Sequence, residues 1–169
     1  MIKVIKDNIV NLDIDCIVNA ANTSLTGGGG VDGAIHAAAG KELHEACAKI
    51  GYCAVGQAVI TPGFKSKAQY IIHTVGPIYN IYDKENCKRL LENCYKNSLD
   101  IARNNNIHNI AFPCISAGVY GYPIIESSDI AINTVKRWVE LNKDYEIDVI
   151  LVCFTDKEYE TYVNRLNYS

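Results

Sequence analysis

Short apolar stretches alternate along this chain with longer amphipathic ones. The apolar stretches cover residues 14–20, 57–61, 69–75, 108–115 and 146–154. Their lengths are typical of strands, and the last two are nearly continuously apolar, as central strands covered on both faces should be. We therefore predict five strands there and an edge strand over residues 1–6.

The amphipathic stretches predict helices over residues 33–50, 84–105, 123–142 and 156–167. In the second of them Cys87, Leu91 and Cys94 recur on one stripe, and Pro123 suits the first turn of the third. Alternating strands and helices predict an α/β fold with a sheet between helices. Ligands of such sheets bind beyond the carboxyl ends of the strands, so the loops after 14–20, 108–115 and 146–154 are the candidate site.

Composition narrows the classes of function. A chain of 169 residues fits one domain, 1–169, and its net charge of −3 argues against general nucleic-acid binding. No apolar run predicts a membrane partner, and the polar first residues do not resemble a signal peptide. The seven cysteines form no C-x-x-C pair, so we expect buried reduced thiols and no metal or cofactor. The default expectation is a cytoplasmic monomer.

The stretch "GGGGVDG", residues 27–33, holds five of the 12 glycines and contains G-x-G-x-x-G from Gly28. A dinucleotide-binding loop would begin directly after its strand and have an acidic residue about 20 positions on. Here seven residues separate Ala20 from Gly28, and the later acid is missing. Two interpretations remain, a flexible exposed turn or a loop whose backbone approaches a phosphate at the start of a helix.

A second glycine loop, "SAGVYG" at residues 116–121, follows another predicted strand. Alone it could be a tight turn. Together the two loops could hold a diphosphate from both sides. Neither contains lysine or arginine, so oriented backbone N–H groups would bind the anion.

Four blocks together resemble the macrodomain family, and its MacroD-type branch in particular: "VNAANTSLTGGGGVDGAIHAAAG" (18–40), "GQAVITPG" (56–63), "IIHTVGP" (71–77) and "PCISAGVYGYP" (113–123). The resemblance implies a three-layer α/β/α fold around a mixed, mostly parallel sheet. It also implies a cleft for ADP-ribose. MacroD-type members remove ADP-ribose from acidic residues of ADP-ribosylated proteins and deacetylate O-acetyl-ADP-ribose, so these become the expected partners.

The resemblance also implies a role for individual residues. Asp32 matches the catalytic aspartate, and Asn22 would bind the hydroxyls of the distal ribose and take part in catalysis. The residues implied to contact ADP-ribose are Asn8, Ile9, Ala21, Gly28, Gly29, Gly30, Val31, Ser116, Ala117, Gly118, Val119, Tyr120 and Phe154.

Several of these side chains also have purely structural explanations. Asp32 precedes an alanine-rich stretch and could be a helix N-cap, and Asn22 could close a turn after a strand. His36 lies one helical turn beyond Asp32 and is either its partner or a packed histidine. His73 is more typical of a structural strand residue than of a catalytic one.

Three positions depart from the pattern that the resemblance implies. Asn8 stands where the family has an aspartate that accepts a hydrogen bond from the adenine amino group, unless Asp7 takes that role. Ala117 replaces a threonine of the phosphate loop, and Phe154 replaces a frequent tyrosine that lies against adenine. These changes concern binding more than catalysis. The leading hypothesis is a hydrolase, the alternative is a reader that binds ADP-ribose without turnover, and a nicotinamide-dependent oxidoreductase is disfavoured by the loop spacing.

Overall fold

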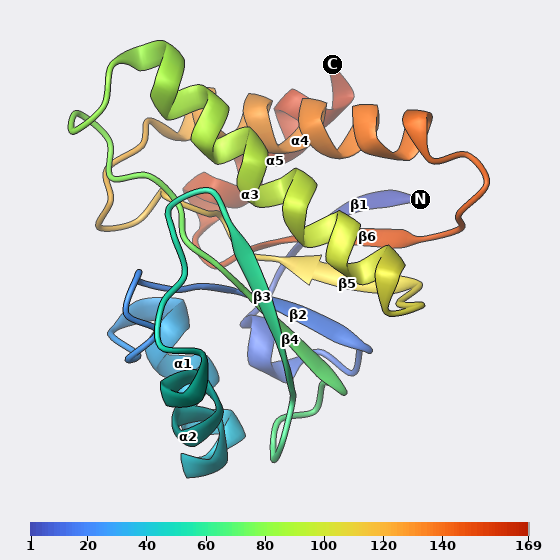
Figure 1. The fold of residues 1–169 in the computed structure, drawn as a ribbon. Coiled ribbons are helices and arrows are strands. Elements are labelled where there is room, and N and C mark those ends of the chain that lie inside the picture. The colour runs from blue at the N-terminus through green and yellow to red at the C-terminus, as the bar shows by residue number, and fades with distance from the viewer. Residues whose placement is uncertain (169) are drawn as a thin grey trace.

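The computed structural model describes residues 1–168. Strands and helices alternate along most of the chain (Figure 1). The six strands are β1 (Ile2–Lys6), β2 (Cys16–Ala20), β3 (Ala58–Pro62), β4 (Tyr70–Thr74), β5 (Asn109–Phe112) and β6 (Asp148–Cys153). The helices are α1 (Gly30–Ala39), α2 (Lys41–Ile50), α3 (Lys84–Asn104), α4 (Ile124–Leu141) and α5 (Asp156–Asn167), with a short 3-10 turn η1 (Ile9–Asn11).

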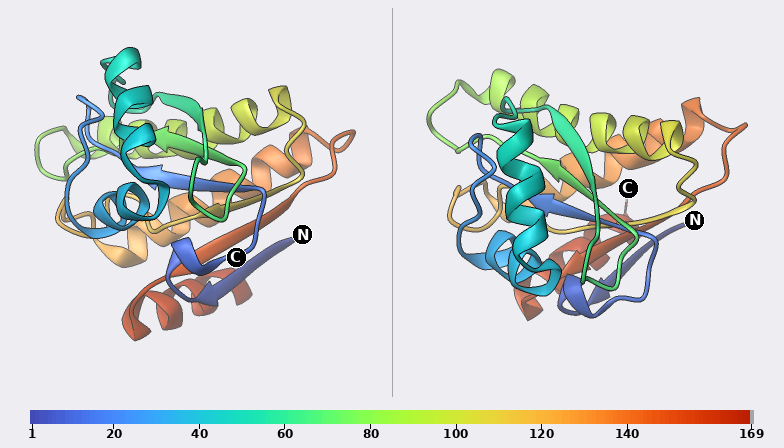
Figure 2. Two further views of the ribbon diagram at one scale, coloured as in Figure 1. Left: turned by 90° about the horizontal axis from the view of Figure 1, so that it is seen from below. Right: turned by 60° about the horizontal axis from the view of Figure 1, so that its bottom comes forward.

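The strands form one sheet in the order β1-β6-β5-β2-β4-β3. The first five in this order are mutually parallel, and β3 alone runs antiparallel to its neighbour β4. The predicted strands, the edge position of the first and the mostly parallel sheet are therefore confirmed. Helices α3 and α4 lie on one side of the sheet, and α1 and α2 lie on the other, as Figure 2 shows in two views that bring α1 and α2 forward.

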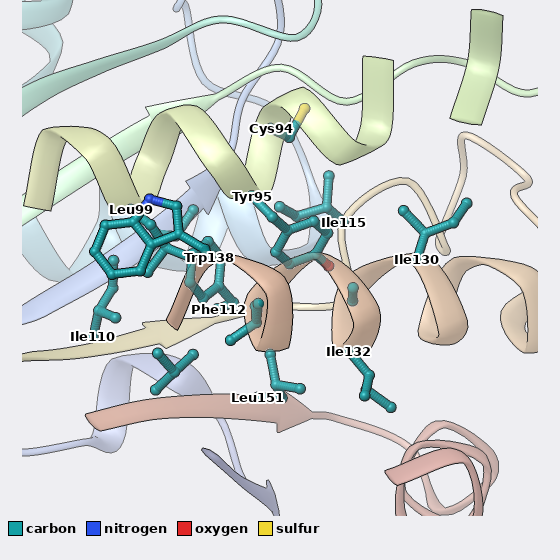
Figure 3. Close-up of a cluster of buried hydrophobic side chains, with 14 of the residues drawn as sticks. Cys94, Tyr95, Leu99, Ile110, Phe112, Ile115, Ile130, Ile132, Trp138 and Leu151 are labelled. Carbon is teal, nitrogen blue, oxygen red and sulfur yellow. The ribbon is translucent and has the colours of Figure 1, made fainter. Parts of the chain in front are cut away.

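Alternation along the strands explains the two helix layers. In β2, Cys16 and Val18 belong to the core beneath α3, α4 and α5, whereas Ile17 belongs to the core beneath α1 and α2. Successive side chains of a strand point to opposite faces, so each central strand supplies both cores. Aromatic and aliphatic side chains fill the first core, among them Tyr95, Phe112 and Trp138 (Figure 3).

The prediction of one helix over residues 33–50 was wrong in two respects. The first helix begins earlier, at Gly30, and the segment breaks at Gly40, whose φ of +86° is left-handed and ends α1. Glycine tolerates this conformation, which lets the chain turn directly into α2. Pro123 was expected in the first turn of the helix over 123–142, but it lies one residue before the observed helix, as the N-cap of α4.

The seven cysteines are free thiols. Six are buried, as their apolar surroundings led us to expect, whereas Cys114 is half-buried. Among residues 1–168, no helix is both long enough and apolar enough to cross a membrane. The same part of the chain contains no group of three or more His, Cys, Asp or Glu side chains arranged to hold a metal ion.

Candidate active site

The predicted ligand-contacting residues gather at one edge of the sheet. They lie in the loops that follow β1, β6, β5 and β2, and these four strands are consecutive neighbours and parallel. Their carboxyl ends therefore meet at the same edge, where α/β sheets bind ligands. The order of the strands places Asn8 beside Phe154 at one end of the edge and the glycine loop at the other.

The glycine loop leads into the N-terminus of α1. Gly29 is the N-cap and has no side chain to satisfy the free N–H groups of the first turn. Those N–H groups and the positive end of the helix are available to an anion. Asp32 is the third residue of the helix, so the alternative explanation of Asp32 as an N-cap is wrong, because the helix begins before it.

One glycine of this stretch is required by a close contact, and two others border open space. A Cβ on Gly33 would come within 2.5 Å of the carbonyl oxygen of Gly28, so glycine at 33 lets the loop lie directly on the helix. A Cβ on Gly29 or Gly30 would meet nothing within 4 Å. The backbone there faces open space, into which a ligand can come close to the chain.

The two carboxylate oxygens of Asp32 have different surroundings. Its residue is 7% exposed, and Oδ1 accepts a hydrogen bond of 2.8 Å from Nδ2 of the buried Asn19 in β2. Oδ2 lies 3.4 Å from where a Cβ of Gly28 would be and accepts no hydrogen bond from the described residues. One oxygen is thus fixed by the sheet, and the other faces the glycine loop.

His36 lies beside the same carboxylate, on the next turn of α1. Its Nε2 is 3.4 Å from Oδ1 of Asp32, and its ring lies against that of His44 with the centroids 4.3 Å apart. Burial lowers the pKa of His36, which the charge of Asp32 opposes and that of His44 reinforces. The ring is 6% exposed, so it is both a neighbour of Asp32 and a packed helical side chain.

The side chain of Asn22 organises the start of the glycine loop. Its Oδ1 accepts hydrogen bonds from Thr26 N at 3.1 Å and from Ser24 Oγ at 3.2 Å, and its Nδ2 donates to the carbonyl of Gly27 at 3.1 Å. These bonds close a turn, as the structural explanation expected. Asn22 is half-buried, so its amide lies at the border of the site, where its hydrogen bonds fix the conformation of the turn before the glycine loop.

The second loop is fixed from beneath and exposed at its tip. Ser116 adopts a left-handed φ of +65°, is buried, and donates from Oγ to the carbonyl of Pro77 at 2.8 Å. Further along the loop, Tyr120 accepts at its carbonyl from Tyr79 N at 2.8 Å. Gly118 and Val119 project into solvent, Val119 with its side chain fully exposed. The hydroxyl of Ser116 therefore fixes the conformation of the loop, and the exposed backbone at the tip is the part that a phosphate could contact.

At the other end of the edge, three of the predicted residues contribute in different ways. Asn8 is the N-cap of η1, with Oδ1 accepting from Val10 N at 3.3 Å. Ile9, like Ala21 near the glycine loop, is 3% exposed and can touch a ligand mainly through its backbone. Phe154 is 64% exposed, so its ring is free to lie against a base.

Sequence reasoning assigned His73 a structural role in a strand but missed its connection, through Asn19, to the side chain of Asp32. Asn19 is fully buried in β2, and His73 and Thr61 continue a row of polar contacts away from it. The available signal was a polar residue at a buried position of an otherwise apolar strand, which usually marks a required hydrogen bond.

Comparison with known proteins agrees with this α/β fold. The Macro domain family matches residues 18–131, and the chain belongs to this family. It is 48% identical over 96% of its length to the ADP-ribose glycohydrolase MACROD2 of Xenopus laevis, of which it spans 39%. It is 47% identical over 98% of its length to the macro domain-containing protein CT2219 of Chlorobaculum tepidum, of which it spans 95%.

A solved structure extends the comparison. The macrodomain of Oceanobacillus iheyensis with ADP superimposes with a TM-score of 0.93 at 41% identity, covering 98% of this chain and 89% of that one. Solved variants of that macrodomain replace an aspartate and an asparagine ten positions earlier by alanine. The same interval separates Asn22 from Asp32 in this chain.

Proposed function

We propose that this chain is an ADP-ribose glycohydrolase. Its substrates would be ADP-ribose esters, in which the distal ribose is linked to an acidic side chain of a modified protein or carries an acetyl group. The observation that carries the proposal is the carboxylate of Asp32, fixed at Oδ1 by Asn19 and open at Oδ2 toward the glycine loop. The names of the MACROD relatives support the same activity.

The order of the strands suggests how ADP-ribose lies along the edge. The adenine would stack on Phe154 near Asn8, because both follow strands at the β1–β6 end of the sheet. The diphosphate would lie between the two glycine loops and be bound by backbone N–H groups. The distal ribose would then reach Asn22 and Asp32.

Hydrolysis of such an ester needs a water molecule placed against the reacting carbon. Oδ2 of Asp32 would accept a hydrogen bond from that water and take its proton as the oxygen attacks. The C–O bond breaks with its electron pair remaining on the leaving oxygen, and the proton passes to that oxygen. Asn19 would keep the carboxylate aimed during these steps, since a small displacement of a catalytic group costs rate steeply.

The alternative is a reader that binds ADP-ribose without turnover. The long fixed edge and exposed loop backbone would serve a reader equally well. A reader, however, has no need for a half-enclosed carboxylate directed at the end of the ligand, because a carboxylate near an anion weakens binding. We therefore favour the enzyme.

The experiment compares wild type, Asp32→Asn and a control on two substrates, a protein ADP-ribosylated on acidic residues and O-acetyl-ADP-ribose. Asp32→Asn keeps the size of the side chain and removes its charge. Asp13→Asn is the matched control, because Asp13 is exposed and lies before β2, at the opposite edge of the sheet.

We expect wild type and Asp13→Asn to release ADP-ribose or acetate at equal rates. We expect Asp32→Asn to be slower by about 10² or more, the usual contribution of a general base. Calorimetry should show that all three bind ADP-ribose. Binding by wild type without release from either substrate would establish the reader, and equal rates for Asp32→Asn would remove Asp32 from the mechanism.

A further inference from the structure

A row of buried polar side chains leads from Asp32 across one face of the sheet. Asn19 in β2 is bonded to Asp32, and its Nδ2 also lies 3.1 Å from Nδ1 of His73 in β4. The other ring nitrogen of His73, Nε2, lies 3.0 Å from Oγ1 of Thr61 in β3. Asn19 and His73 are fully buried, and Thr61 is 4% exposed.

The strand register explains why these three side chains meet. Asn19 is directly paired with His73 between β2 and β4, and His73 pairs with Val59 between β4 and β3. Thr61 is two positions from Val59, so its side chain is on the same face and diagonal to His73. That face is the one covered by α1, which carries Asp32.

The donors and acceptors in this row allow one arrangement. The carboxylate of Asp32 accepts, so the amide nitrogen of Asn19 must be the group that faces it. The second hydrogen of that amide then points to Nδ1 of His73, which must be the acceptor nitrogen of a neutral ring. The ring proton is therefore on Nε2 and is donated to Oγ1 of Thr61.

The neutral state of His73 agrees with its burial. Loss of hydration, and to a smaller extent the nearby His36, lowers the pKa of His73 to about 4. The side chains facing the ring include Asn19, Thr61 and His36, whose ring centroid is 6.5 Å away. A doubly protonated ring would turn a donor toward the amide of Asn19 and break the row.

We propose that His73 and Thr61 are positioning residues for the reaction, which fix the amide of Asn19 so that it holds Asp32. Neither touches the open side of the site. Without the acceptor nitrogen of His73, the side-chain amide of Asn19 is free to rotate by half a turn, which exchanges the positions of its oxygen and nitrogen. Its Oδ1, buried and without a hydrogen-bond partner among the described residues, would then face the carboxylate and repel it. The inference rests on the proposed hydrolysis for its effect on rate.

The test replaces Thr61 by valine and by serine. Valine has the same shape as threonine but cannot accept a hydrogen bond from Nε2 of His73, whereas serine keeps the hydroxyl that can. Ser98→Ala is the matched control, because it also removes a fully buried hydroxyl, one bonded within α3 to the carbonyl of Cys94. Each variant is assayed for kcat and KM on O-acetyl-ADP-ribose, for ADP-ribose Kd by calorimetry and for thermal melting.

We expect Thr61→Val to lower kcat about tenfold, short of the ~10²-fold loss of a badly misplaced catalytic group. Its KM and Kd should stay within about twofold of wild type, because Thr61 does not reach the ligand. Thr61→Ser should recover kcat, and Ser98→Ala should keep it even if its melting temperature falls. A Thr61→Val protein that is folded and retains wild-type kcat overturns the positioning role.

A second measurement does not depend on turnover. Nitrogen-15 NMR of the histidine rings in wild type should show His73 neutral and protonated on Nε2 across pH 6–8. In Thr61→Val the side-chain amide protons of Asn19 should exchange faster with water. A His73 protonated on Nδ1 overturns the proposal whether or not the protein is a hydrolase. The Nε2 form in a protein without activity would instead count against the proposed function alone.

Discussion

Replacing Gly33 by alanine tests whether the glycine loop must lie on helix α1. A Cβ at this position would come 2.5 Å from the carbonyl oxygen of Gly28, whereas ordinary contact begins at 3.4 Å. The carbonyl must therefore retreat by the difference, about 0.9 Å. That movement displaces the backbone of the exposed glycines that follow, which is the part of the loop proposed to bind the diphosphate.

Two opposing effects determine stability. Alanine within a helix gains about 0.5–1 kcal/mol over glycine, while forcing an atom into a packed contact costs about 1–3 kcal/mol. We expect a net loss of about 0–2.5 kcal/mol in the free energy of unfolding. Binding should suffer more, since each N–H···phosphate bond lost costs about 1.5–3 kcal/mol, which raises Kd about tenfold or more.

Calorimetric titration with ADP-ribose measures this effect, and thermal melting of the same sample shows that the variant is folded. Gly29→Ala is an informative comparison, because its Cβ meets no protein atom within 4 Å and φ there is −91°. It should leave the free protein as stable as wild type. If Gly33→Ala binds ADP-ribose within twofold of wild type, the loop does not need its close approach to the helix, and our account of this glycine is wrong.

Three further predictions concern the adenine end and pH. Asn8→Asp keeps the cap on Val10 and supplies a charged acceptor, so calorimetry should show ADP-ribose binding about fivefold tighter, from about 1 kcal/mol; unchanged affinity would exclude this side chain as the adenine acceptor. Phe154→Ala should weaken binding about tenfold by removing a stacking surface, and Phe154→Tyr should not, as the same titration would reveal. The lowered pKa of His73, about 4 against 6.5 unfolded, means that the unfolded chain binds more protons between these values, so stability is lost as pH falls through this window. Urea unfolding should show a free energy of unfolding about 2 kcal/mol lower at pH 5 than at pH 7. If a His73→Gln variant loses as much stability between these pH values, groups other than His73 cause the loss.

Much of the fold follows from patterns that depend on neighbouring residues in the sequence. The apolar runs identified the strands, and Pro123 and the amphipathic stripe of α3 placed two helices near their observed bounds. The break at Gly40 was not predicted, because alanine-rich sequence on both sides favours one continuous helix. A tertiary contact accompanies the break: the carbonyl of Ala39 accepts a hydrogen bond from Lys65 N at 3.1 Å, in the segment between β3 and β4.

The site, too, has one part that the sequence predicts and another that depends on the tertiary structure. The glycine loops and Asp32 stand out in the sequence because their residue types are unusual in a packed domain. The support of Asp32 does not, because Asn19, His73 and Thr61 are far apart along the chain and meet only through strand register. Similarly, Asn22 looked like a ligand-binding residue or a turn residue, and only its hydrogen bonds place it in the turn.

The pairing of β1 with β6 joins the first residues of the chain to nearly the last. Because β1 is an edge strand, residues 2–6 have no strand partner in this sheet until residues 148–153 have been synthesised. The glycine loop, β2 and β4 come from the first half of the chain, so the strands around Asp32 do not depend on this pairing, whereas the segments that carry Asn8 and Phe154 do. The proposed recognition of the base by Asn8 and Phe154 therefore depends on a contact between two ends of the described chain, the β1–β6 pairing that completes the sheet.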